Sequence, residues 1–271
     1  MTEFAIDRLV QIVREAGDAI LQVYETDFEV ANKQDESPLT QADLAAHRII
    51  VAGLEALTPE VPIVSEESEP PEYAVRKQWP SYWLVDPLDG TKEFVNRNGE
   101  FTVNIALIEG NQAVAGIVGV PVQDSVYVGD VRTGQAQKLS GSNASDLRPR
   151  KMVGSTQELI IVASRSHGSD ELENYISSVS AHFSGIDKRP VGSSLKLCAL
   201  AEGLADFYPR IGPTSEWDIG AAHAVLAAAG GAVWQLDRAP LTYNAKESLL
   251  NPYFVAVADA SFDWWSVLPE A

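Results

Sequence analysis

The chain has 271 residues, 45% of them apolar and 21% charged, which is typical of a globular protein with an ample core. Its formal net charge of −18, from 38 acidic and 20 basic residues, argues against general binding to nucleic acids or to anionic membrane surfaces. A single cysteine, Cys198, excludes an internal disulfide, and no signal peptide or long apolar stretch is evident, so we expect a cytoplasmic protein.

The first half of the chain is predicted to form two helices followed by a β-rich region. The expected helices cover residues 3–25 and 41–57, with a polar loop at 31–40 between them. The expected strands cover residues 61–64, 82–85, 102–108, 113–120, 125–128 and 135–138. Short turn sequences between the last four strands indicate two hairpins.

The second half is predicted to alternate between strands and helices. The segment 140–156 is polar and rich in Gly and Ser, so we expect an internal boundary there, between an N-terminal subdomain of residues 1–145 and a C-terminal subdomain of residues 146–271. The elements expected after it are strands at 159–163, 206–208, 232–236 and 254–258, and helices at 170–182, 194–205 and 218–229. This α/β (α+β) pattern favours ligand binding at the carboxyl ends of strands and the N-termini of helices.

The segment VDPLDGTKEF, residues 85–94, places several acids directly behind an apolar run. Asp86 and Asp89 stand three residues apart on a predicted turn, where both side chains and the Leu88 carbonyl can point to one side. Gly90 allows close backbone approach, and Thr91 presents a hydroxyl and an N–H to a phosphate or an attacking water. Such a cluster repels itself unless a cation lies within it, and oxygen ligands favour magnesium.

Three further acidic positions stand at the edges of predicted elements, and each has an ordinary structural alternative. Asp43 fits a helix-capping pattern with Thr40, and Asp218 is a possible N-cap of the helix that it opens. The pair Glu66-Glu67 is typical of a solvated loop. Carboxylates from separate loops can instead share two metal ions roughly 4 Å apart, the arrangement used for phosphoryl transfer.

A different class of phosphatase has a similar signature. Haloacid-dehalogenase-type enzymes also end a buried strand in an acid pair before Gly-Thr, but their two acids are two residues apart. The spacing of three between Asp86 and Asp89 makes a covalent aspartyl-phosphate intermediate less favoured.

Several motifs in the same order resemble the inositol monophosphatase superfamily of magnesium-dependent, lithium-sensitive phosphomonoesterases. They are V-S-E-E at 64–67, W-L-V-D-P-L-D-G-T at 83–91 and W-D at 217–218. Within the superfamily, the chain looks most like 3′(2′),5′-bisphosphate nucleotidases of the CysQ type. The segments that carry this finer resemblance are 37–43, 86–94, 98–107, 164–167 (S-R-S-H), 192–196 (G-S-S-L-K) and 208–214.

The resemblance implies a layered α-β-α-β-α sandwich and two to three Mg²⁺ ions. Glu67, Asp86 and the Leu88 carbonyl would hold the first ion, and Asp86, Asp89 and Asp218 the second. Glu67 and waters fixed by Asp43 would hold the third, with Glu66 the less favoured member of its pair. Asp43 and Thr91 would orient a metal-activated water for direct attack on phosphorus, and the backbone at Gly90 and Thr91 would bind the phosphate.

The substrate implied is 3′-phosphoadenosine 5′-phosphate, which would lose its 3′-phosphate to give AMP. The second phosphate needs partners outside the metal cluster, and the motifs place Ser164, His167, Ser193 and Lys196 there. Arg165 and Arg210 are weaker candidates, and Lys33 belongs to a possible lid. Two alternatives stay open: an inositol or sugar monophosphatase with the same metals, and a non-catalytic metal-binding domain. The sequence leaves the oligomeric state and peripheral membrane association undecided.

Overall fold

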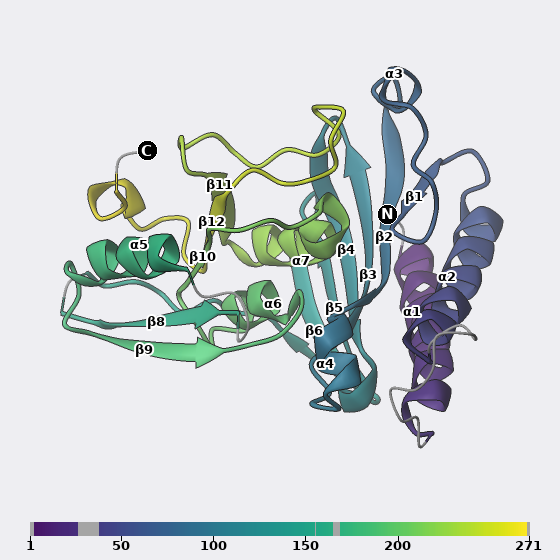
Figure 1. Ribbon diagram of the computed structural model, residues 1–271, viewed down its shortest axis with the longest axis horizontal. Helices are drawn as coiled ribbons and strands as arrows, with labels where there is room; N and C mark the ends of the chain where they lie inside the picture. The colour runs from purple at the N-terminus through teal and green to yellow at the C-terminus, as the bar shows by residue number, and fades with distance from the viewer. Residues whose placement is uncertain (1–2, 27–37, 155, 165–168, 270–271) are drawn as a thin grey trace.

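The computed structural model describes residues 3–26, 38–154, 156–164 and 169–269. Helices and sheets alternate in layers, as Figure 1 shows: a helix pair, a seven-stranded sheet, central helices, a five-stranded sheet and an outer helix. This arrangement confirms the α-β-α-β-α sandwich expected from the sequence.

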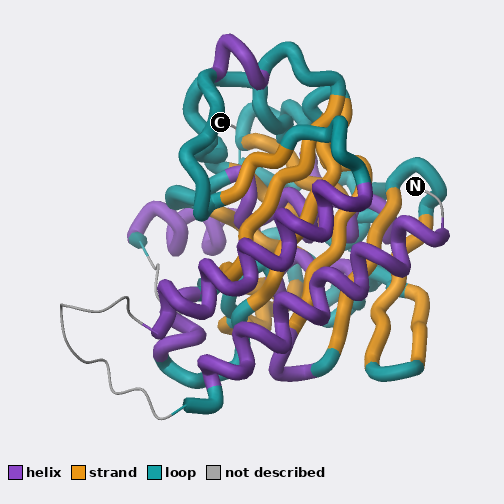
Figure 2. Tube along the Cα trace, turned by 90° about the vertical axis from the view of Figure 1, so that its right-hand side faces the viewer, coloured by secondary structure: helices purple, strands orange, loops and turns teal. Residues whose placement is uncertain are grey.

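The outer helix pair consists of α1 (Glu3–Tyr24) and α2 (Pro38–Leu57), which lie side by side across one face of the first sheet (Figure 2). Apolar residues of both helices are fully buried, as the helical spacing predicted. The second helix begins three residues before its expected start at 41, because a proline is well tolerated in a first helical turn. Thr40 therefore lies inside the helix, and the capping pattern proposed for Thr40 and Asp43 is wrong.

The seven strands of the first sheet follow one another in chain order, with β1 parallel to β2 and every later pair antiparallel. They are β1 (Ile63–Ser65), β2 (Ser81–Asp89), β3 (Thr102–Glu109), β4 (Gln112–Val120), β5 (Ser125–Asp130), β6 (Gln135–Ser140) and β7 (Asn143–Asp146). Short helices α3 (Tyr73–Arg76), α4 (Thr91–Val95) and η1 (Pro121–Gln123) join some of them. The edge strand β7 was not predicted, because all its residues are exposed and carry no apolar alternation.

The second sheet has the order β11-β12-β10-β8-β9. Its strands are β8 (Glu158–Ala163), β9 (Gly185–Pro190), β10 (Phe207–Arg210), β11 (Ala232–Gln235) and β12 (Phe254–Val257). The accompanying helices are α5 (Asp170–Ser180), α6 (Leu195–Ala201) and η2 (Trp264–Ser266). The polar edge strand β9 escaped prediction for the same reason as β7.

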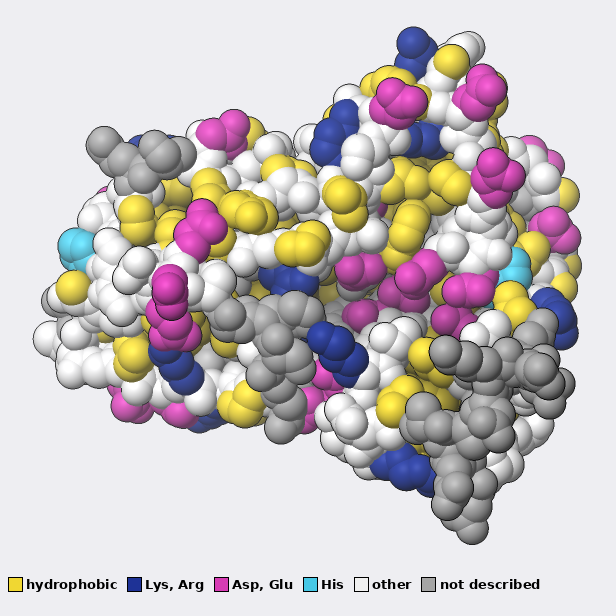
Figure 3. All heavy atoms as spheres, in the orientation of Figure 1, with side chains coloured by type: hydrophobic (Ala, Val, Ile, Leu, Met, Phe, Trp, Pro, Cys, Tyr) yellow, Lys and Arg dark blue, Asp and Glu magenta, His cyan; other side chains and the backbone are white. Residues whose placement is uncertain are grey.

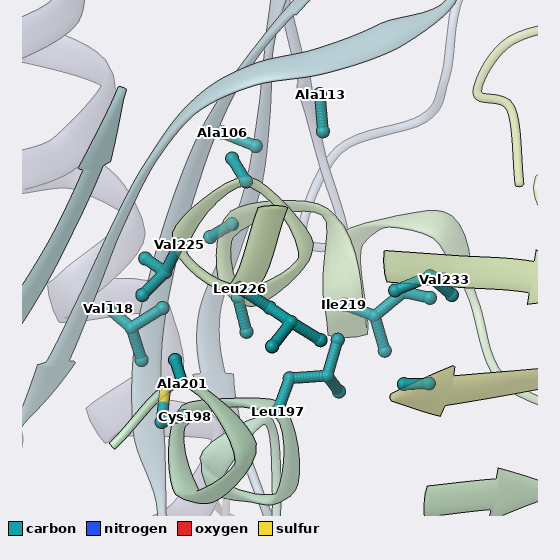
Figure 4. Close-up of a cluster of buried hydrophobic side chains, with 14 of the residues drawn as sticks. Ala106, Ala113, Val118, Leu197, Cys198, Ala201, Ile219, Val225, Leu226 and Val233 are labelled. Carbon is teal, nitrogen blue, oxygen red and sulfur yellow. The ribbon is translucent and has the colours of Figure 1, made fainter. Parts of the chain in front are cut away.

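The central helix α7 (Glu216–Ala229) is buried between the two sheets. Glycines in the first sheet allow α7 to approach it closely. A Cβ on Gly116 of β4 would lie 2.0 Å from the Ala221 carbonyl oxygen, and one on Gly129 of β5 would lie 2.4 Å from the Val225 Cα. Figure 4 shows the apolar cluster that α7 shares with α6 and the strands around it. The helix that carries Asp218 is thus held rigidly on all sides.

The boundary expected between residues 145 and 146 falls at the end of β7, and the next strand belongs to the other sheet. Because α7 packs against strands of the first sheet, the division into subdomains of residues 1–145 and 146–271 stays a prediction. Within the described ranges, no helix combines the length and the apolar character needed to cross a bilayer.

Candidate active site

The segment that carries Asp86 and Asp89 is the end of strand β2. The register with β3 shifts between these two residues, and the backbone N–H of Leu88 donates a 3.0 Å hydrogen bond to Oδ1 of Asp86. Gly90 follows with a φ of 98°, and a Cβ there would lie 3.2 Å from the Glu100 carbonyl oxygen. Only glycine fits this turn without strain. Thr91 then begins α4.

Glu66 comes next to Asp86 because β1 and β2 are parallel. Ser65 pairs with Val85, and the Glu66 N–H donates a 3.1 Å hydrogen bond to the Val85 carbonyl. Desolvation and the charge of Asp218 raise the pKa of Glu66, while a hydrogen bond with the Asp86 carboxyl lowers it. Glu66 was the less favoured member of its pair in the sequence-based assignment, because the register of β1 against β2 was not known from the motif.

Glu67 lies on a different side of the same turn, toward α2. Its charge acts on Asp43 and also on His47, whose ring Nδ1 is 2.9 Å from the Ser65 hydroxyl. The structure therefore places Glu67 beside Asp43, and places Glu66 beside the Asp86 carboxylate.

Asp43 is 7% exposed, and its Oδ1 atom has no hydrogen-bond partner among the residues that the structure describes. Burial first, and then the charges of Glu67 and Glu66, raise its pKa to about 8. A buried carboxylate oxygen without a donor is costly, so this atom favours a cation or a water as its partner.

Asp218 lies in the first turn of α7 and not at its N-cap, which is Ser215. The two residues form a capping box in which the Ser215 N–H donates a 2.9 Å hydrogen bond to Oδ2 of Asp218. Burial raises the pKa of Asp218, while this hydrogen bond and the cations Arg210 and Lys196 lower it. The cap fixes one carboxylate oxygen and leaves the other toward the cluster.

The carboxylates of the cluster destabilise one another's ionised forms. Burial, followed by the charges of Asp89, Glu66, Asp218 and Asp43, raises the pKa of Asp86 well above its ordinary value. Figure 3 shows acidic side chains gathered in a hollow near the middle of one face. No group of three or more His, Cys, Asp or Glu side chains within the described ranges is arranged as a formed metal site. The donors are nevertheless all oxygens and need positive charge, a combination that suits a hard cation.

A cavity of about 300 Å³ adjoins these carboxylates. One part of its lining is formed by the acidic turn and the start of α7. The other part, the basic wall, carries cationic and hydroxyl side chains and is called the phosphate wall below. The lining includes Asp89, Gly90, Thr91, Ser164, Ser193, Lys196, Tyr208, Arg210, Thr214 and Asp218.

Among the described residues, three cations line this cavity: Lys92 of α4, Lys196 of α6 and Arg210 of β10. The Lys196 ammonium donates a 2.7 Å hydrogen bond to the Ser193 carbonyl and lies 5.6 Å from the centre of the Tyr208 ring. Burial lowers its pKa to about 8, against the opposing charge of Asp89. The Arg210 Nη2 donates a 2.5 Å hydrogen bond to the Pro213 carbonyl, and its Nε is buried without a hydrogen-bond partner in the described ranges of the chain.

The remaining predicted residues divide into two groups. Ser164 and Ser193 line the cavity as expected, whereas His167, Arg165 and Lys33 lie outside the described residues. Cys198 is fully buried in α6, and burial raises the pKa of its thiol, so it is not available as a nucleophile.

Comparison with known proteins gives four findings. A sequence model of the inositol monophosphatase family matches residues 2–260. The 3′(2′),5′-bisphosphate nucleotidase CysQ of Salmonella typhimurium is 47% identical over 251 residues, which are 92% of this chain and 98% of that protein. The crystal structure of CysQ from Bacteroides thetaiotaomicron superposes with a TM-score of 0.85 at 40% identity, covering 94% of this chain and 97% of that one. An inositol monophosphatase from Zymomonas mobilis, 22% identical with a TM-score of 0.75 over 96% of this chain and 95% of that one, shares the fold.

Proposed function

Because the chain belongs to the inositol monophosphatase family, we propose that it is a 3′(2′),5′-bisphosphate nucleotidase. It hydrolyses the 3′-phosphate of 3′-phosphoadenosine 5′-phosphate to give AMP and phosphate. The observation that carries this proposal is the 47% identity, over 92% of the chain, to a protein of that name. The cavity supports it, because acidic and basic residues line the same space and can bind a metal cluster and a second phosphate together.

The enzymes of this family are metal-dependent phosphatases, and we infer that the acidic cluster would hold two to three magnesium ions. Its buried carboxylates have raised pKa values, so their ionised forms are unfavourable until a cation neutralises the charge. We assign Asp86, Asp89, Asp218 and the Leu88 carbonyl as ligands. We also assign Glu66 to them in place of Glu67, because Glu66 is the one in contact with Asp86.

Bound magnesium would lower the pKa of a water molecule and neutralise charge on the phosphoryl oxygens. Asp43 would accept a hydrogen bond from the attacking water at its otherwise unpaired Oδ1, and the Thr91 hydroxyl would fix the direction of approach. The backbone at Gly90 and Thr91, which lines the cavity, would bind the phosphate. We infer that the attack is direct, and Cys198 is too deeply buried to act as an alternative nucleophile.

The basic wall would bind the 5′-phosphate. Ser164, Ser193 and Lys196 line it, and we add Arg210 because this cation lines the same cavity. A compact ammonium beside a planar guanidinium gives strong charge-assisted hydrogen bonds to phosphate oxygens. This second anchor distinguishes a bisphosphate from inositol 1-phosphate.

The test is phosphate release by the purified protein in magnesium buffer. We expect 3′-phosphoadenosine 5′-phosphate to be hydrolysed much faster than inositol 1-phosphate or fructose 1,6-bisphosphate. Equal or reversed rates would establish a broader inositol or sugar phosphatase. Absence of turnover on every substrate would leave a non-catalytic metal-binding domain.

A further inference from the structure

Two of the sequence segments that resemble the nucleotidases, 98–107 and 192–196, meet directly behind Asp89. The first contributes Thr102 and Asn104 from β3, and the second contributes Ser194 just before α6. All three are buried, with exposures of 0%, 1% and 1%. These three buried polar side chains belong neither to the acidic cluster nor to the basic wall that would bind the 5′-phosphate.

The three side chains form a closed ring of hydrogen bonds. The Asn104 Nδ2 donates to Thr102 Oγ1 at 3.2 Å, and the Ser194 hydroxyl donates to Asn104 Oδ1 at 2.7 Å. Because Ser194 has only one hydroxyl proton, the 2.8 Å contact between Thr102 Oγ1 and Ser194 Oγ is a bond that Thr102 donates. Each group in the ring is donor and acceptor at once, and such cyclic networks are rigid.

The ring is connected to the acidic cluster through the backbone of Ser194. Its N–H donates a 2.6 Å hydrogen bond to Oδ2 of Asp89. This bond orients the buried carboxylate of Asp89, which is repelled by the negative charge of Asp218. The direction of one Asp89 oxygen therefore depends on where Ser194 is held.

The same short loop faces the proposed phosphate wall. Ser193 has a φ of 44°, a conformation that is unfavourable for a residue with a side chain, and its carbonyl accepts the bond from Lys196. Upstream, the Gly192 N–H donates a 2.7 Å hydrogen bond to Glu100 Oε2. The loop is thus held at both ends, with Ser193 and Lys196 facing the cavity and Ser194 facing the ring.

We propose that Ser194 is a positioning residue that sets the Asp89 carboxylate relative to the phosphate wall. Its hydroxyl is anchored in the ring with Thr102 and Asn104, and its N–H holds Asp89. The loop of residues 192–196 and the acidic cluster would therefore keep a fixed position relative to each other. This inference rests on the proposed function, and it adds a role for residues that contact neither metal nor substrate.

The experiment compares Ser194→Ala with Ser193→Ala, a neighbouring change of the same size. Two quantities are measured for each protein: the magnesium concentration that gives half of the maximal rise in melting temperature, and kcat and KM for 3′-phosphoadenosine 5′-phosphate. The first needs no substrate. For Ser194→Ala we expect the magnesium requirement to rise about tenfold and kcat to fall about tenfold, the loss typical of one broken buried hydrogen bond to a charged network. For Ser193→Ala we expect a higher KM and an unchanged magnesium requirement.

Thr102→Val provides a second test, since it keeps the shape of the side chain and leaves the Ser194–Asn104 bond intact. We expect a smaller rise in the magnesium requirement than for Ser194→Ala, and this variant decides the matter if Ser194→Ala does not fold. The inference is overturned if folded Ser194→Ala, or folded Thr102→Val in its absence, keeps the magnesium requirement and kcat of the wild type. A wild-type protein that neither gains stability from magnesium nor hydrolyses the bisphosphate would overturn the proposed function first, and the inference with it.

Discussion

The carboxyl groups of Glu66 and Asp86 lie side by side and act on each other's pKa, although 20 positions separate the two residues in the chain. The contact follows from the parallel register of β1 and β2, in which Ser65 pairs with Val85, so that the next residue of each strand lies at the same edge of the sheet. Two carboxyls can share such a contact only by sharing a proton or a cation. The proposed magnesium site would lie at this edge.

Replacing Glu66 is expected to be more harmful than replacing Glu67. Glu66→Gln removes a charge from the group around Asp86 and Asp218, so we expect loss of activity of about a hundredfold or more at moderate magnesium, with partial recovery at high magnesium. Glu67→Gln removes a charge that acts mainly on Asp43 and His47, so it should be the milder variant. Steady-state rates across a magnesium titration test this order, and a more severe defect in Glu67→Gln would restore the assignment made from sequence.

Asp89→Asn is expected to abolish turnover and leave the fold intact. The substitution keeps an oxygen that can accept the Ser194 N–H and removes the charge that a cation needs. Because the pKa of Asp89 is raised to about 8 by burial and by Asp218, a neutral amide should relieve repulsion in the metal-free protein. Circular dichroism and melting temperature in EDTA should match or exceed the wild type. The matched control is Asp146→Asn, an exposed acid on β7, which should keep full activity.

Lys196→Met is expected to weaken bisphosphate binding selectively. Methionine keeps the apolar stem and loses the ammonium that lies beside Ser193 and Tyr208. We expect KM for 3′-phosphoadenosine 5′-phosphate to rise about tenfold or more, the usual loss for one charge-assisted bond to phosphate. Hydrolysis of a substrate with a single phosphate should change much less. A similar loss on both substrates would mean that Lys196 acts on the metal cluster through Asp89.

The sequence could predict that Asp86 and Asp89 cluster, because this part of the proposed site is local. Asp86, Leu88, Asp89 and Gly90 stand within five residues, and their spacing alone indicates a turn that gathers oxygen ligands. The choice between Glu66 and Glu67 was not local. It depends on the register of β1 against β2, which nothing in a four-residue motif encodes.

The elements that escaped prediction have a common physical cause. Strands β7 and β9 lie at sheet edges with mostly exposed side chains, so neither shows an apolar period. The ring of Thr102, Asn104 and Ser194 could not be predicted from the sequence either, because Ser194 lies 92 and 90 residues from the other two and meets them only through tertiary packing. In contrast, α1 and α7 were predicted almost correctly, because the spacing of their apolar and small residues indicates which helix faces are buried.

Gly116→Ala is expected to destabilise the protein strongly. Its Cβ would fall 2.0 Å from the Ala221 carbonyl oxygen, which belongs to a helix backbone that cannot move aside without shifting Asp218. Overpacking of this kind costs about 1–3 kcal/mol or more. The control is Gly185→Ala on the edge strand β9, where the nearest neighbour would be 3.7 Å away. Urea unfolding should show a loss for Gly116→Ala and little change for the control; equal midpoints would contradict the close packing of α7 on β4.

His223 is expected to make the folded state sensitive to mild acid. Burial lowers the pKa of His223 to about 4 from an ordinary value of 6.5, and its Nδ1 is 2.7 Å from the hydroxyl of buried Tyr243. Between these two pH values the unfolded chain binds a proton that the native state does not. The free energy of unfolding therefore has its full value above pH 6.5 and falls as the pH is lowered toward 4, by at most about 3 kcal/mol from this group.

His223→Gln isolates this contribution, because glutamine still offers Tyr243 a hydrogen-bond partner and does not titrate. The raised pKa values of the acidic cluster act in the opposite direction with pH, but they are common to both proteins and cancel in the comparison. We expect the wild type to lose more stability than His223→Gln between pH 7.5 and pH 5 in urea unfolding with EDTA present. Parallel loss in the two proteins would show that His223 is protonated in the native state with little cost, and that α7 admits water along the side that faces Tyr243.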